Sequence, residues 1–311
     1  MKVASALPLI VITTLGASLP AFAQDDSLLP TFYGKLNVTA ALDEPEQGNA
    51  SGGLESHASR IGLKGDYALS STLNLIYQAE YQVNPGDEKF AHFNLTQRNS
   101  FVGLEGGFGT LLVGRNDTPS KLLQNGIDLF NDLNGDIKFL FLSEIRPNDV
   151  VQYTSPTKNG FTASYEAIID GQKTIGDRAT KHSSASVTYG QGAFLFGVAI
   201  DHSVVNVDSV RFMSRYREGN LQLGLMYESA KTSRGDKNGV FVSAAYEIDK
   251  LVLKAQTGAA DQRFEGATQS TVGFDYNLDP ESRVFALVTH TGADNRAVIN
   301  DHFDIGFEHN F

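Results

Sequence analysis

The chain has 311 residues, no cysteine, 41% hydrophobic residues and a formal net charge of −11 at pH 7. The acidic balance argues against nucleic acid as a partner, and the lack of cysteine excludes a fold held by disulfides. No apolar stretch after the N-terminal region reaches the length of about 18 residues that a transmembrane helix needs.

The first 23 residues have the features of a secretory signal peptide. Lys2 precedes an apolar run that ends near Leu19, and the triplet AFA ends at Ala23. A cationic start, an apolar middle and a cleavage site of small residues are typical of export. We therefore expect a signal peptide over residues 1–23, cleaved after Ala23, and one domain over residues 24–311.

From Thr31 onward, apolar and polar residues alternate with a period of two. In the stretch TFYGKLNVTAAL, Phe32 and Leu36 fall on one side, and Lys35 and Asn37 fall on the other. The same alternation recurs along the chain and ends with HFDIGFEHNF at residues 302–311. A β-strand turns such rows to opposite faces of its sheet, so the pattern predicts an all-β fold.

Short turns and longer polar loops alternate between the predicted strands. The short turns lie near residues 69–72, 106–109, 156–160, 190–193, 218–220, 248–250 and 278–281. The longer loops lie near residues 43–55, 84–94, 116–148, 169–181, 202–207, 230–238, 260–266 and 292–299.

This order of turns is typical of an up-and-down antiparallel sheet of about 16 strands. An open sheet of this size would expose two edges, so we expect a closed transmembrane β-barrel whose last strand pairs with the first. The apolar rows would then face lipid. Two packed sheets with a dry core are the soluble alternative.

The loop near residues 116–148 is the longest and has apolar residues of its own, which is typical of a functional loop. Asp128, Asp132 and Asp136 recur at a spacing of four, which on a helix would form one acidic stripe. Two arrangements stay open: a solvated lid at the rim, or a loop folded into the lumen with its aspartates toward the channel. The spacing around Gly135 does not fit an EF-hand, because Phe130 would be the first ligand.

Several segments together resemble the trimeric general diffusion porins of Gram-negative outer membranes. FYGKL resembles the family's first strand, ASRIGLKG its second, QRNSFVGLEGGFGTLLVGR its fourth and fifth, and RPNDVVQYTSP the strand after the constriction loop. The closing GFEHNF resembles the terminal signature that the barrel-assembly machinery reads, with Gly306, Phe307, His309 and Phe311 at its positions. The fourth strand alternates less regularly, and we expect Asn99 on its lipid side.

The resemblance implies a set of site residues. Lys35, Arg60, Arg98 and Arg146 would form a cationic wall at the pore constriction. The acidic residues opposite would be Asp128, Asp132 and Asp136 of the third loop, which the resemblance folds into the lumen.

The resemblance also implies a function and its partners. We expect a homotrimer in the outer membrane of a Gram-negative cell, in contact with the lipid bilayer and lipopolysaccharide, that lets small hydrophilic solutes and ions diffuse passively. The alternatives are a channel selective for sugars or anions and, outside the membrane, a secreted β-sandwich that binds glycans or surfaces. The sequence has no nucleophile motif or zinc motif, so we expect no enzyme, cofactor or metal site.

Overall fold

The computed structural model describes residues 29–84, 95–169, 181–232 and 234–311. The predicted signal peptide lies outside the described residues, as do nearly all of the loops predicted near residues 84–94 and 169–181. No helix in the described part of the chain is long and apolar enough to cross a membrane.

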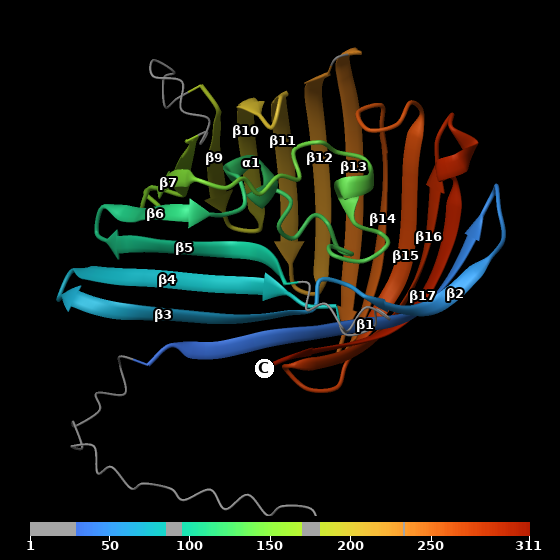
Figure 1. Cartoon of the computed structure of the whole chain (residues 1–311), viewed down its shortest axis with the longest axis horizontal. Helices are drawn as coiled ribbons and strands as arrows, with labels where there is room; N and C mark the ends of the chain where they lie inside the picture. Colours follow the sequence, from blue (N-terminus) through green and yellow to red (C-terminus); the bar gives the residue numbers. More distant parts are fainter. Residues whose placement is uncertain (1–28, 85–94, 170–180, 233) are drawn as a thin grey trace, which may run out of the picture.

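The described strands form one antiparallel sheet that closes on itself (Figure 1). The first half contains β1 (Thr31–Pro45), β2 (Ser51–Ser56), β3 (Arg60–Ser70), β4 (Leu73–Gln82), β5 (Thr96–Gly106), β6 (Gly109–Arg115), β7 (Val150–Thr154) and β8 (Phe161–Ile168). The second half contains β9 (Ser183–Gln191), β10 (Phe194–Val204), β11 (Val207–Glu218), β12 (Leu221–Thr232), β13 (Gly235–Ile248), β14 (Leu251–Ala260), β15 (Ala267–Asn277), β16 (Ser282–Gly292) and β17 (Asn300–Asn310). Three short helices are α1 (Pro119–Leu122), η2 (Ile137–Phe139) and η3 (Arg296–Val298).

The sheet has 17 strands, but β2 and β3 are two parts of one crossing, because β1 pairs with both in succession. Counted in this way, the barrel wall consists of 16 antiparallel strands, and the predicted closed antiparallel barrel is confirmed. The packed pair of sheets, and with it the secreted β-sandwich, is wrong.

The barrel closes where β17 pairs with β1. Their register runs from Lys35 opposite Asn310 to Pro45 opposite Asn300. Phe311 extends the pairing beyond β17, since its backbone exchanges two hydrogen bonds of 2.8 and 3.1 Å with Gly34. The terminal phenylalanine therefore lies at the seam of the closed wall.

The four predicted residues of the terminal signature have different surroundings. Phe307 and Phe311 are exposed on the outer face, and His309 Nδ1 lies 2.9 Å from the Ser282 hydroxyl. Gly306 faces inward, where an added Cβ would lie 2.3 Å from the ring of Phe285. The need for glycine at 306 is therefore explained by packing, and the assembly role of the four residues stays a prediction.

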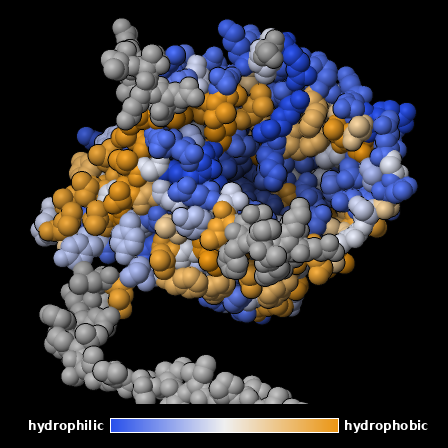
Figure 2. Space-filling view, in the orientation of Figure 1, coloured by the Kyte–Doolittle hydropathy of each residue, from blue (hydrophilic) through white to orange (hydrophobic). Residues whose placement is uncertain are grey.

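Apolar side chains point out of the wall, and most of the side chains that point in are polar or small. On β12, Leu223, Leu225 and Tyr227 are exposed, and Gly224 between them is buried. Figure 2 shows hydrophilic residues gathered in and around a central hollow, with hydrophobic residues on much of the outside. The prediction that the apolar rows of the strands face outward is confirmed.

The predicted short turns are confirmed, but several of the longer connections are shorter than predicted. β10 and β11 are joined by residues 205–206 alone, where Val205 and Asn206 have φ angles of 48° and 65°. Two successive residues with positive φ are typical of a tight hairpin turn. Backbone pairing continues here into polar sequence, because a ladder of hydrogen bonds does not require alternating apolar side chains.

The segment between β6 and β7, residues 116–149, has its own hydrophobic core against the wall. Its side chains pack with inward-facing residues of β10 to β14 such as Met213, Met226 and Phe241. The residues of the segment in this core are Leu123, Ile127, Ile137, Leu140 and Phe141. The apolar side of the segment is thus buried against inward-facing residues of the wall.

Candidate functional site

Three of the predicted cationic side chains converge on Asp132. Arg60 Nη2 and Lys35 Nζ lie 2.9 and 3.2 Å from Asp132 Oδ2, and Arg98 Nη2 lies 3.9 Å from Oδ1. Lys35 and Arg60 face each other in the register of β1 and β3. The ion pairs therefore join the 116–149 segment to the first strands of the wall.

A β-bulge places Arg98 in this group. Ala79 pairs with Ser100 and Tyr81 pairs with Gln97, so two residues of β5 oppose Glu80 alone. A bulge turns consecutive side chains toward one face. Asn99 accordingly donates to Asp117 Oδ2 at 3.4 Å, and its expected place on the lipid side is wrong.

The ion pairs continue along the inner wall in both directions from Asp132. Glu80 Oε1 accepts from Arg98 Nε at 2.8 Å and lies 3.6 Å from Arg60 Nη1. On the other side, Lys35 lies 3.6 Å from Glu308, which also pairs with Arg283 at 3.0 Å. We call these residues, with Asp275 and Lys254 next to Arg283, the lining network. The acidic partners Glu80 and Glu308 were not among the predicted site residues.

Arg146 pairs with a different carboxylate from the other predicted cations. It belongs to the 116–149 segment itself and pairs with Asp117, with Nε 3.0 Å from Oδ1. Lys121 pairs with the same carboxylate at 3.0 Å. Arg146 lines a cavity of about 280 Å³ together with Arg98 and Asp132. Arg146 thus differs from the other three in lying within the loop, and its role at the pore constriction stays a prediction.

The three predicted aspartates do not form a stripe, because residues 128–136 are a series of turns. Asp132 has a φ of 69°, outside the helical region. Asp128 accepts from the amides of Phe130 and Ile137, and Asp136 accepts from those of Asp132 and Lys138. Asp132 is thus the only one of the three that pairs with the predicted cations, and the other two shape the loop.

Burial and neighbouring charge act in opposite directions on these carboxyl groups. Burial raises the pKa of Asp128 well above its ordinary value, and Asp136 beside it adds to the shift. Burial alone would also raise the pKa of Asp132, but Lys35, Arg60 and Arg98 outweigh it and lower that pKa to about 2. Asp132 is therefore ionised in neutral and mildly acidic solution.

A depressed carboxyl pKa predicts a defined pH dependence. The charge of Asp132, and the stability it adds, are fully present above its ordinary pKa and are lost as the pH falls toward about 2. The difference in reversal potential between the wild type and Asp132→Asn should therefore persist from about pH 7 to about pH 4. Measurements in a salt gradient at each pH check this. A difference that is already halved at about pH 4 contradicts the lowered pKa.

Inward-facing glycines provide the space in which the loop packs. An added Cβ at Gly224 of β12 would lie 3.1 Å from Ile127 Cγ2 and 3.2 Å from Ile127 Cα. At Gly197 of β10 it would lie 3.0 Å from Leu123 Cδ2, and at Gly258 of β14 it would lie 2.7 Å from Leu140 Cδ1. Glycine at an inward position within a strand can indicate, from the sequence alone, that another part of the chain packs closely there.

Replacement of Gly224 by valine should push the loop away from the wall and lower the free energy of unfolding by about 1–3 kcal/mol. Trypsin should then cleave the loop faster at Lys121 and Lys138, which mass spectrometry of timed digests measures. Gly53→Val is the matched control, since nothing lies within 4 Å of a Cβ at that position. Equal cleavage rates in the two variants would contradict the docking role of Gly224.

A buried arginine, absent from the predictions, anchors the loop to the opposite part of the wall. The Arg211 side chain on β11 is 0% exposed and lies 2.6 Å from Glu228 and 2.8 Å from Glu144 of the loop. Its Nη1 also donates to the Ser120 carbonyl at 3.1 Å. The loop is thus fixed by charge at both sides, at Asp132 and at Glu144.

Two outer-membrane proteins of other bacteria are similar to this chain over most of its length. The outer membrane porin protein 32 of Delftia acidovorans is 25% identical over 309 residues, covering 89% of this chain and 87% of that protein. The major outer membrane protein P.IB of Neisseria sicca is 26% identical over 274 residues, covering 81% of this chain and 75% of that protein.

Two solved structures show the same fold. The anion-selective porin from Comamonas acidovorans superposes with a TM-score of 0.72 at 20% identity, over 91% of this chain and 99% of that one. Salmonella typhi OmpF, in a complex with daunomycin, superposes with a TM-score of 0.75 at 15% identity, over 93% of this chain and 99% of that one. The model of the Gram-negative porin family matches residues 6–296. The chain therefore belongs to the Gram-negative porin family.

Proposed function

We propose that this outer-membrane porin conducts small hydrophilic solutes and ions past a constriction lined by Asp132 of the 116–149 segment and by the wall cations that pair with it. The observation that carries the proposal is the convergence of Lys35, Arg60 and Arg98 on this one carboxylate. The burial of the segment's apolar side against inward-facing residues supports its place inside the barrel.

The charges at the constriction account for the kind of solute that passes. The paired charges of the wall and of Asp132 create a local field in the channel that orients water. An apolar solute would have to displace this ordered water, whereas a polar solute can replace its hydrogen bonds. Polar and charged linings therefore favour small hydrophilic solutes.

The charge balance of the lining network supports weak ion selectivity. It holds four carboxylates, Glu80, Asp132, Asp275 and Glu308. It holds five cations, Lys35, Arg60, Arg98, Lys254 and Arg283. A near balance of this kind favours a general channel with a small anion preference over one selective for sugars or anions.

The remaining parts of the proposal rest on membership of the family. We propose that the mature protein begins after Ala23, assembles as a homotrimer and acts without catalysis. Gly306, Phe307, His309 and Phe311 would be read by the barrel-assembly machinery, and the outer face would contact lipid and lipopolysaccharide. Residues Asp128 and Asp136 would serve the constriction by holding the turns around Asp132.

Conductance of detergent-extracted protein in a planar bilayer tests the channel. We expect large steps that occur in groups of three and change little when sugars are added. Steps that are blocked by micromolar sugar would overturn the general channel in favour of a selective one. Protein that inserts without producing steps would overturn the channel itself.

A further inference from the structure

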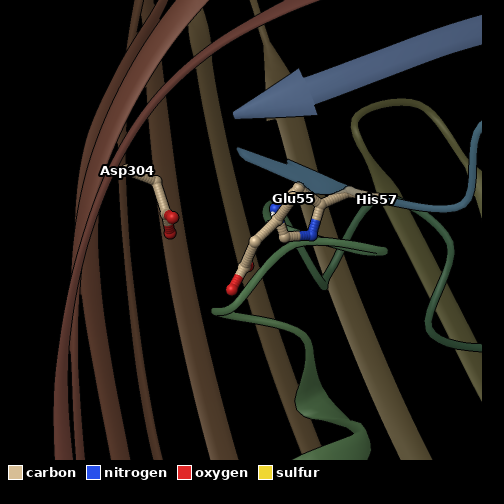
Figure 3. A group of neighbouring side chains, drawn as sticks. All are labelled: Glu55, His57 and Asp304. Carbon is tan, nitrogen blue, oxygen red and sulfur yellow. Dashed lines mark ion pairs between the residues drawn. The ribbon is translucent and has the colours of Figure 1, made fainter. Parts of the chain in front are cut away.

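Three side chains with metal-binding atoms meet on the inner wall, next to the lining network. Glu55 on β2, His57 directly after β2 and Asp304 on β17 each offer one such atom, and these atoms all lie within 4.8 Å of one another (Figure 3). His57 Nε2 lies 3.5 Å from Glu55 Oε2. His57 and Asp304 are buried, and Glu55 is partly exposed.

The two carboxylates of this cluster lack a cationic partner. In the described part of the chain, neither Glu55 nor Asp304 forms an ion pair with lysine or arginine. The Asn134 amide of the loop contacts Glu55 Oε2 and both oxygens of Asp304, each at 3.2 Å. Asp304 is only 2% exposed. Two like charges held together in this way are costly unless a positive charge joins them.

The types of donor point to a transition metal rather than to calcium or magnesium. One imidazole and two carboxylates are ligands that zinc accepts, whereas calcium and magnesium prefer oxygen donors alone.

Small movements would bring the donors to one ion. Two ligand atoms that each lie about 2.1 Å from a tetrahedral zinc ion are about 3.4 Å apart, so the widest pair of donors must close by up to about 1.4 Å, which side-chain rotation can supply. The ion would take the place of the 2.7 Å contact between His57 Nε2 and Thr39 Oγ1. A half turn of the Asn134 amide would present its oxygen to the ion, because the two amide atoms are nearly equal in size.

We propose that Glu55, His57 and Asp304, with Asn134 of the loop, bind a divalent transition-metal ion of the zinc type. The adjoining cavity of about 350 Å³, lined by His57, Asn134 and Lys138, provides access. The ion would fasten the loop to β2 and β17, on the far side from its Arg211 anchor. This binding is separate from conduction and does not depend on it.

Calorimetric titration of the detergent-solubilised protein with zinc chloride tests the site. The protein is prepared without a histidine tag and treated with EDTA before dialysis. We expect one zinc ion per chain, with binding weakened at least tenfold in His57→Gln and in Asp304→Asn. His290→Gln is the matched control, because His290 pairs with Asp301 at an exposed position outside the cluster and should leave binding unchanged.

The alternatives give different outcomes. A wild type that binds no zinc, or a His57→Gln variant that binds it as the wild type does, overturns the site. Calcium binding as strong as zinc binding overturns the assignment to a transition metal. Circular dichroism confirms that each variant is folded. If His57→Gln fails to fold, Glu55→Gln replaces it, because the partly exposed Glu55 side chain contributes less to packing.

Discussion

Replacement of Arg211 by methionine should lower the free energy of unfolding by about 3–5 kcal/mol, because it leaves two buried carboxylates without a cation. Glu228 is 0% exposed and Glu144 is 3% exposed, so water cannot replace the lost guanidinium. The hydrogen bond to the Ser120 carbonyl is lost as well. Chemical unfolding in detergent, followed by circular dichroism, measures the change.

The loss should grow with pH. Burial raises the pKa of Glu144 to about 7 even though Arg211 acts to lower it. Without Arg211, no cation opposes the burial of Glu144, so the folded chain favours the neutral form of this carboxyl group, whereas the unfolded chain ionises it above its ordinary pKa. The destabilisation of the variant should therefore be smaller at about pH 5 than at about pH 8.

A matched control and a rescue separate this explanation from a general effect of losing an arginine. Arg215 lies four positions further on β11 and also donates to a loop carbonyl, that of Asn125 at 3.1 Å, but its side chain is partly exposed. Arg215→Met should cost less than about 1 kcal/mol. Arg211→Met combined with Glu228→Gln and Glu144→Gln should regain most of the lost stability. Equal losses in the two single variants, or no rescue, would contradict the anchor.

The fold could be predicted from the sequence because a strand's period of two fixes which side chains share a face. Leu223 and Leu225 lie on the opposite face of the strand from Gly224 and Met226, whatever surrounds the strand. Once the sheet is closed, the apolar row with Leu223 and Leu225 faces outward and therefore has to contact lipid. The position of the bulge at Arg98 and Asn99 was not predictable in this way, since a bulge is set by how β4 and β5 pair.

The candidate site was predictable only in part, for a different reason. Lys35, Arg60 and Arg98 lie in segments whose order and spacing resemble a family. Glu144 and Arg211 are separated by 67 positions and carry no periodic signal, so only the folded loop brings them together. The spacing of Asp128, Asp132 and Asp136 suggested a helix, but helical spacing has no meaning in the turns that the loop adopts.

Replacement of Asp132 by asparagine should shift the ion selectivity strongly toward anions. Lys35, Arg60 and Arg98 would keep their charges while the carboxylate that all three face becomes neutral. A unit charge at about 5 Å acts on a permeating ion with about 1 kcal/mol in water, which corresponds to roughly a fivefold change in the ratio of chloride to potassium permeability. Reversal potentials in a potassium chloride gradient measure this ratio.

Two further variants decide whether the effect belongs to the position of the charge. Asp132→Glu retains the charge and should keep a selectivity near that of the wild type. Asp236→Asn removes one carboxylate from an exposed site on β13, outside the lining network, and should change the ratio little, since salt screens exposed charges. If Asp236→Asn shifts the ratio as far as Asp132→Asn does, the overall charge of the protein controls selectivity. If only Asp132→Asn shifts it, ions pass within a few ångströms of the carboxylate on which the three cations converge.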